Sequence, residues 1–206
     1  MVWYRDGWPV PRETSTVNLI LRVLGPEHTE RDYAALMEDP GALRDWSASA
    51  WPPDDFTAAE NAADLTRHEA EWERREAFAY TVLSADESRC EGCVYIRPYD
   101  SSQWHPRIAP TSAAPQADEH AAVVTWWMRP SAVAQKLDEE LLAGLMGWLR
   151  ADWRFSEVFF LVNQERSRDL LLHREAGLHE IATARSVDGS TRWHLFRLQD
   201  EGAPEL

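Results

Sequence analysis

The 206-residue sequence has little positive charge, only two cysteines and no long apolar run. Its 21 Lys and Arg residues stand against 35 Asp and Glu residues, which gives a formal net charge of -14. Nucleic acids and anionic membrane surfaces select clustered Lys and Arg, so the acidic excess argues against both as partners. A cationic amine suits this charge better.

No segment approaches the roughly 18 consecutive apolar residues of a membrane-spanning helix. The amino terminus, MVWYRDGWPVPRETS, also lacks the continuous apolar core of a signal peptide, so we expect a cytoplasmic protein. A hydrophobic fraction of 44% is sufficient for one sizeable core. The sequence predicts a single domain over 1–206, with an amino-terminal extension (1–16), a long Pro- and Ser-rich loop (98–118) and an acidic tail (199–206).

The two cysteines form the motif CEGC, from Cys90 to Cys93, a spacing that redox and zinc sites share. A redox pair normally opens a helix that lowers its thiol pKa, and a zinc site needs two further ligands, usually as a second close pair. This motif instead enters the strand-like CVYIRP. We therefore expect no metal, a buried Cys93 and a Cys90 beside a turn.

Hydrophobic periodicity predicts strands that alternate with helices. The expected strands are VNLILRVLG (17–25), two within 77–98, HAAVVTWWM (120–128), EVFFLVN (157–163), LHEIATARS (178–186) and TRWHLFRLQ (191–199). The expected helices follow Pro26, begin at the capping box of Thr57 and Glu60, run from Gln135 to about Asp152, and span 166–177. The stretch 40–55 is rich in turn residues. The order predicts an α/β (α+β) fold, a mixed sheet of about seven strands with about four helices on its faces.

This order resembles the GCN5-related N-acetyltransferase (GNAT) superfamily from Val17 to Leu198. The local matches are the strand end WWMRP (126–130), the helix that follows it, and LLLHREAGL (170–178). RHEAEWERREAFAYTVL, GCVYI and the loop before LDEELL are similar to a branch of the superfamily with an unconventional cofactor loop. The resemblance implies a centrally splayed sheet that opens after Trp127, and acetyl-CoA as cosubstrate.

The loop between the strand 120–128 and the next helix departs from the family pattern. In the superfamily, backbone amides of this loop bind the cofactor pyrophosphate at a helix amino terminus, and two glycines allow the close approach. Here Val133 stands at the usual basic position, and Lys136 and Asp138 replace the glycines. The resemblance implies these cofactor contacts: Trp127, Met128, Arg129, Ala134, Gln135, Lys136, Leu137, Asp138 and Asn163.

Two interpretations of this loop compete. In the first, Ala132, Ala134 and Gln135 are small or flexible enough for the loop to close around phosphate, Lys136 supplies positive charge, and Asp138 caps the helix while facing away. In the second, the Asp138 carboxylate repels a diphosphate and the fold works without coenzyme A. We favour binding.

Acetyl transfer to an amine needs a group that accepts the ammonium proton. The family often carries a carboxylate on the strand before the loop, where this chain has Val123. The base must then come from elsewhere, and we rank His68 above His120 and Glu119. The alternative for His68 is a solvent-exposed or capping role.

The family tyrosine that protonates the leaving thiolate corresponds to His173, four residues before Gly177. Histidine can donate a proton near neutrality. The alternative for His173 is a structural role at a helix carboxyl end, where the dipole favours a cation.

A Trp-rich segment is the candidate acceptor site. Trp46, Trp51 and Phe56 would wall a pocket in which Asp54 and Asp55 attract a cation, although such aromatics also pack cores. The leading hypothesis is an N-acetyltransferase acting on a small amine. The alternatives are a catalytically silent ligand- or partner-binding protein and an acyl-CoA enzyme with a non-amine acceptor. A homodimer is compatible with the sequence.

Overall fold

The computed structural model describes residues 3–99 and 115–199, so the acidic tail from residue 200 and most of the predicted long loop lie outside the described residues. The strands are β1 (Glu13–Ser15), β2 (Leu19–Val23), β3 (Phe78–Ser84), β4 (Cys90–Pro98), β5 (Ala122–Met128), β6 (Val158–Asn163), β7 (His179–Arg185) and β8 (Arg192–Arg197). The helices are the 3-10 turn η1 (Pro26–His28), α1 (Thr29–Leu36), α2 (Pro40–Ser47), α3 (Ala58–Glu73), α4 (Pro130–Val133), α5 (Leu137–Ala151) and α6 (Ser167–Glu175).

The strands form one sheet in the order β1-β2-β3-β4-β5-β6-β8-β7. The predicted mixed sheet with helices on its faces is confirmed, with β1, α2 and α4 as additional elements. The sequence favoured turns where α2 forms. However, Asp39 accepts a hydrogen bond from the Ala42 amide at 3.0 Å and Pro40 occupies the first turn, which is a regular helix start.

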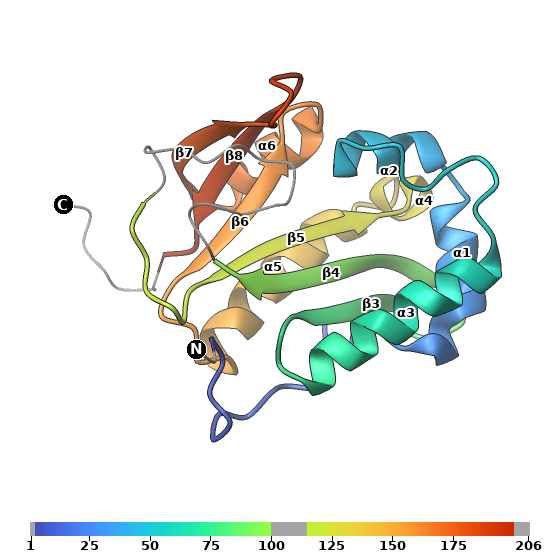
Figure 1. Ribbon diagram of the computed structural model, residues 1–206, viewed down its shortest axis with the longest axis horizontal. Helices are drawn as coiled ribbons and strands as arrows, with labels where there is room; N and C mark the ends of the chain where they lie inside the picture. Colours follow the sequence, from blue (N-terminus) through green and yellow to red (C-terminus); the bar gives the residue numbers. More distant parts are fainter. Residues whose placement is uncertain (1–2, 100–114, 200–206) are drawn as a thin grey trace.

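The two faces of the sheet are covered differently (Figure 1). Helix α5 packs on one face through the predicted apolar stripe, whose buried members are Leu141, Leu142, Leu145, Trp148 and Leu149. Helices α1 and α3 cover β3 and β4 on the other face, where Leu36 and Leu65 are buried. The predicted capping box starts α3, because the Thr57 and Glu60 side chains accept hydrogen bonds from each other's backbone amides.

The sheet opens between its two parallel strands. β5 and β6 pair only from Ala122 with Val158 to Val124 with Phe160, although both strands continue further. The predicted splay is therefore confirmed, but it begins after Val124 and not after Trp127. Figure 1 shows β5 and β6 diverging, with α2 lying across the open end.

Residues near the amino terminus are part of the core. Trp3 and Tyr4 are buried, and the Trp3 ring lies 5.5 Å from the Phe78 ring, centroid to centroid. The amino-terminal segment thus closes the end of the sheet opposite the splay (Figure 1). Among the described helices, none has the length and apolar character needed to cross a membrane.

Candidate functional site

A cavity of about 490 Å³ lies on the face of the sheet that α1, α2 and α3 cover. Its floor includes Tyr95 and Arg97 of β4 and Val123 and Thr125 of β5. It therefore begins beside the point where β5 leaves β6. Its volume is typical of sites for small ligands, which span roughly 300–1,000 Å³. The remaining lining residues are Leu24, Asp32, Leu36, Trp46, Trp51, Asn61, Asp64, Leu65, Arg67 and His68.

His68 of α3 lies in the wall of this cavity. Its Nδ1 is 3.2 Å from a Glu71 carboxylate oxygen and its Nε2 is 3.3 Å from Arg67 Nη2. A guanidinium only donates hydrogen bonds, so Nε2 is the acceptor and Nδ1 carries the proton. Burial, reinforced by the Arg67 charge, lowers the pKa of His68 to about 4. The imidazole is therefore neutral at neutral pH and can accept a proton once Arg67 releases Nε2.

The predicted acceptor residues separate into two groups. Trp46 and Trp51 line the cavity as predicted. Asp54 and Asp55 do not. The Asp54 side chain is 93% exposed and pairs with Arg44 at 2.5 Å, and Asp55 is also exposed. Among the predicted residues, the structure thus brings only the tryptophans to His68.

The carboxylates that line the cavity are Asp32 and Asp64, and two cations, Arg67 and Arg97, accompany them. Desolvation raises the pKa of Asp32 above its ordinary value, which several hydrogen bonds partly oppose. The charge of the cavity is thus mixed. The alternation within CVYIRP places Tyr95 and Arg97 on the face of Cys93, so these two residues could have been found from the sequence.

The other two proposed bases lie away from the cavity. His120 Nδ1 is 2.8 Å from the Trp3 carbonyl oxygen, and its Nε2 is 2.8 Å from Arg5 Nη2. Glu119 lies 3.7 Å from the same imidazole. These contacts hold the amino-terminal segment against the sheet, and neither residue is among those that line the cavity.

His173 of α6 is buried on the face of the sheet that α5 also covers. Its ring stacks on Trp126 of β5, with centroids 5.8 Å apart, and lies 5.5 Å from Phe160 of β6. Nδ1 is 2.6 Å from the Asp169 carbonyl oxygen, so it carries the proton of the neutral ring, and Nε2 has no partner among the described residues. Burial lowers the pKa of His173. Because Trp126 and Thr125 point to opposite faces, the sheet separates His173 from His68.

The predicted cofactor loop is folded on itself. The amides of residues 132–136 all donate to carbonyl oxygens three or four residues earlier, through α4 and the turn that follows it. A pyrophosphate site needs several amides that converge on empty space. Lys136 instead adopts the left-handed conformation, with φ of 62°, and the Gln135 side chain donates to the Ser131 carbonyl.

The carboxylate of Glu38 occupies the remaining anion position at this loop. It accepts hydrogen bonds from the Ser131 amide at 2.8 Å, from the Ser131 hydroxyl at 3.1 Å, and from Arg129 Nε at 2.5 Å. Partial burial raises the pKa of Glu38, but the Ser131 and Arg129 contacts outweigh it, so the pKa lies below its ordinary value. Glu38 therefore stays ionised at the amino end of α4.

Asp138 faces away from the loop surface. It is buried, and Arg168 of α6 binds both its oxygens, at 2.6 and 2.9 Å. The predicted repulsion of a diphosphate by Asp138 is weakened because this carboxylate is already neutralised. Lys136 is exposed and lies 3.6 Å from Glu139.

Helix α2 closes the mouth of the splay. The Asn163 amide, at the end of β6, donates a hydrogen bond to the Asp45 carbonyl oxygen of α2. Leu43 and Trp46 lie over Met128 and Arg129, where only a hollow of about 10 Å³ is left. The predicted contacts Trp127, Met128 and Asn163 thus stand at the splay, and α2 covers them.

No family model matches the sequence, and no curated protein matches it. Solved structures do match. The microcin C7 self-immunity acetyltransferase MccE, in complex with acetyl-CoA and AMP, has a TM-score of 0.69 and 9% identity, over 91% of this chain and 96% of that one. RimL, the ribosomal L7/L12 alpha-N-protein acetyltransferase, has a TM-score of 0.66 and 13% identity, over 94% and 96%.

The ribosomal-protein-S5-alanine acetyltransferase from Vibrio fischeri has a TM-score of 0.68 and 12% identity, over 93% of this chain and 99% of that one. A putative GNAT-family acetyltransferase from Bordetella pertussis reaches 0.64 at 16% identity, over 91% and 99%. Likeness at such low identity concerns the fold. The chain has the fold of the GNAT acetyltransferases.

Proposed function

We propose that the protein is an acetyl-CoA-dependent acyltransferase that acetylates a primary amine. The observation that carries this proposal is the separation of β5 from β6 directly beside a cavity of about 490 Å³. The gap between the two separated strands would let the thioester arm of the cofactor pass between them and reach an acceptor in the cavity. Proteins of this fold that bind acetyl-CoA and coenzyme A support the choice of cosubstrate.

The acceptor is a small amine that also carries an anionic group. Trp46, Trp51 and Tyr95 offer aromatic faces and Asp64 a carboxylate to an ammonium group. Arg97 offers a guanidinium to a carboxylate or phosphate. Peptide amino termini are the competing acceptor class, because ribosomal proteins are the stated substrates of two proteins that share the fold.

His68 removes the ammonium proton after Arg67 leaves Nε2, because burial and the Arg67 charge, which lower the pKa of His68, otherwise oppose its protonation. The free amine then attacks the thioester carbonyl carbon. The second proton of the attacking nitrogen passes to the sulfur as the carbon–sulfur bond breaks, which yields an amide and a thiol. We assign His173 to the side of the sulfur, because its ring contacts both Trp126 of β5 and Phe160 of β6. In its neutral tautomer Nε2 lacks a proton, so it accepts a hydrogen bond from the product thiol and acts as an acid only after a second protonation, which burial opposes.

The cofactor diphosphate takes the position of the Glu38 carboxylate on the Ser131 amide, with Arg129 as its counter-charge. An anion at a helix amino end is stabilised by amides and dipole alike. Helix α2 must also move, because it covers the strand ends through Asn163 and Met128. Binding is therefore weaker than in a chain whose loop is open.

Calorimetric titration with acetyl-CoA and coenzyme A tests the proposal. Glu38→Gln removes the competing charge, so we expect affinity to rise about tenfold, or about 1.4 kcal/mol. Arg129→Ala should lower it, and Glu13→Gln, which removes an exposed carboxylate elsewhere, should leave it unchanged. An absence of binding in both the wild type and Glu38→Gln would contradict the proposal.

A catalytically silent binding protein is the second candidate. Two features favour a silent protein. The loop amides bind carbonyl oxygens of the loop itself, and the Glu38 carboxylate binds the Ser131 amide, so none of the amides of residues 131–136 is left for a cofactor. Release of coenzyme A thiol, measured with a panel of amino acids and a panel of peptides, separates the two. Amino acids should support turnover better than peptides. Binding of amino acids without any thiol release would establish the silent protein.

A further inference from the structure

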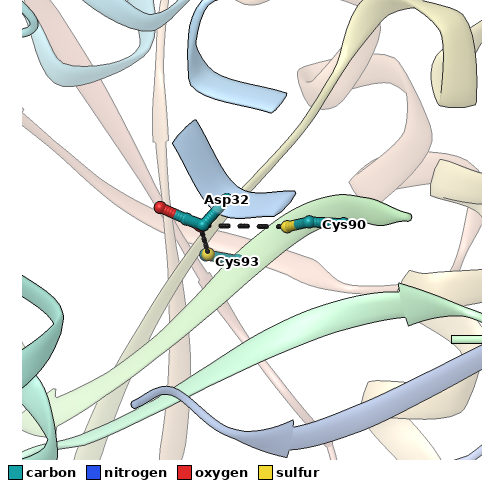
Figure 2. A group of neighbouring side chains, drawn as sticks. All are labelled: Asp32, Cys90 and Cys93. Carbon is teal, nitrogen blue, oxygen red and sulfur yellow. Dashed lines mark hydrogen bonds between the residues drawn. The ribbon is translucent and has the colours of Figure 1, made fainter. Parts of the chain in front are cut away.

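Three buried side chains that the proposed reaction does not use meet at one edge of the cavity. Figure 2 shows the thiols of Cys90 and Cys93, on β4, directed at the carboxylate of Asp32, on α1. Asp32 Oδ1 lies 3.2 Å from Cys93 Sγ and 3.8 Å from Cys90 Sγ. All three ligand atoms lie within 4.8 Å of one another.

A bulge in β4 brings the two thiols to the same face. Residues three apart on a regular strand point to opposite faces. Here Val82 pairs with Gly92 but Leu83 pairs with Cys90, so one extra residue of β4 lies between them and restores the common face. Gly92 is required at this point, because a Cβ atom there would collide with the backbone carbonyl of Trp127.

We propose that Asp32, Cys90 and Cys93 bind a zinc-like divalent ion. Tetrahedral zinc with Zn–S of about 2.3 Å and Zn–O of about 2.0 Å separates sulfur from oxygen by about 3.5 Å. The two observed separations of 3.2 and 3.8 Å bracket that value. Thiolate and carboxylate ligands together suit zinc and not magnesium or calcium, which select oxygen.

The surroundings supply the other requirements of such a site. Asn61 donates a hydrogen bond to Asp32 Oδ2 at 2.9 Å, which fixes the carboxylate and leaves Oδ1 for the ion. Asp32 also lines the cavity, so a water molecule or ligand atom from the cavity would supply the fourth ligand. The ion would link α1 to β4 at the cavity floor.

Charge and atoms balance on binding. Two S–H bonds break, two metal–sulfur bonds and one metal–oxygen bond form, and two protons leave to solvent. The entering dication replaces these two protons, so the net charge of the cluster is the same before and after binding. A buried site tolerates such an exchange better than the addition of an uncompensated charge.

The first experiment uses the wild-type chain, stripped of metal with a chelator that is then removed, and titrated with Co²⁺ and Zn²⁺. We expect one equivalent of Co²⁺ to bind with a sulfur-to-cobalt charge-transfer absorption, and Zn²⁺ to displace it. No uptake, or uptake without that absorption, would overturn the proposal. This readout needs no variant and no acyltransferase activity, so it stands apart from the proposed function.

Variants then assign the ligands. Cys90→Ser and Cys93→Ser should each reduce the absorption, because one thiolate remains, and weaken Zn²⁺ binding by more than about 100-fold; Asn61→Ala should weaken it by about 10- to 100-fold. The double serine variant should lose the absorption. His179→Gln, an exposed histidine remote from the cluster, should bind as the wild type does. Wild-type affinity in both serine variants would overturn the assignment. Circular dichroism of each metal-free variant controls for folding.

Discussion

The acceptor-side cavity lies beside Val123 and Thr125 of β5, and the cofactor loop follows the last residue of that strand, Met128. The two sites differ in how their charged groups are used. The cavity is an open volume with a neutral His68, two carboxylates and two arginines in its wall. The loop is closed, because its amides and the arginines around it already bind groups of the same chain. The cavity can accept a ligand as it stands. A ligand of the loop must first displace the Glu38 carboxylate.

This difference between the open cavity and the closed loop shows that a GNAT-like sheet can be present without an open anion site in the loop after β5. In a chain of net charge -14, the cations near the loop have acidic partners: Arg129 pairs with Glu38, and Arg168 pairs with Asp138. Sequence identity at the glycine positions is therefore less informative than the identity of these partners.

The largest effect should come from the buried pair that holds the loop to α6. Arg168→Met leaves the Asp138 side chain, only 1% exposed, without a counter-charge, and should lower the free energy of unfolding by about 3 kcal/mol, the lower end of the range for buried pairs, because the Arg168 side chain is 47% exposed. Asp138→Asn should cost less, because the Arg168 side chain is 47% exposed and remains hydrated. Urea denaturation at neutral pH measures both, and equal costs would contradict this asymmetry.

A substitution of His68 tests the role of the cavity. His68→Ala should lower kcat by about 100-fold or more, the usual cost of a positioned general base, with little change in cofactor affinity. Thr66→Ala, an exposed position on the same helix, is the control. Full turnover in His68→Ala with an identified acceptor would remove His68 from the mechanism.

Local patterns predicted the elements that have periodic or capping signals. The capping box at Thr57 and the α5 stripe are confirmed because helix caps and apolar periodicity depend on neighbouring residues only. The segment 40–55 contains Pro, Gly and Ser, which are typical of turns, although Pro also occurs in the first turn of helices. Asp39 followed by Pro40 is the local signal for the start of α2.

Contacts between distant segments could not be predicted in this way. Glu38 and Ser131 are 93 residues apart, and Asp32 and Cys93 are 61 apart. Their pairing depends on how α1 lies over β4, which no local pattern encodes. Asp32 could not be linked to the CEGC motif for the same reason, because further zinc ligands are expected from sequence only as a second close pair.

Acidification from pH 6.5 to about 4 should lower the free energy of unfolding through His68 in the cavity wall. Burial lowers the pKa of His68 from 6.5 to about 4, so between these values the unfolded chain binds the proton and the folded one resists it. The contribution of the neutral imidazole to stability is complete above pH 6.5 and is lost as the pH falls towards 4. His68→Gln should therefore flatten the fall in unfolding free energy across this window. Parallel curves for variant and wild type would show that His68 titrates normally.

The smallest effect concerns Lys136, the residue that stands where the fold's acetyltransferases usually have a glycine. Its side chain is 73% exposed and its ammonium lies 3.6 Å from Glu139, so water and salt screen most of its field. Lys136→Ala should weaken acetyl-CoA binding only about two- to threefold at low salt, and not measurably at high salt. Arg129→Ala should retain its loss at both, because Arg129 is largely buried against Glu38 and the loop. A loss of tenfold or more on removing Lys136 would place the diphosphate over the α5 amino end, away from Ser131, and would show that the loop opens on binding.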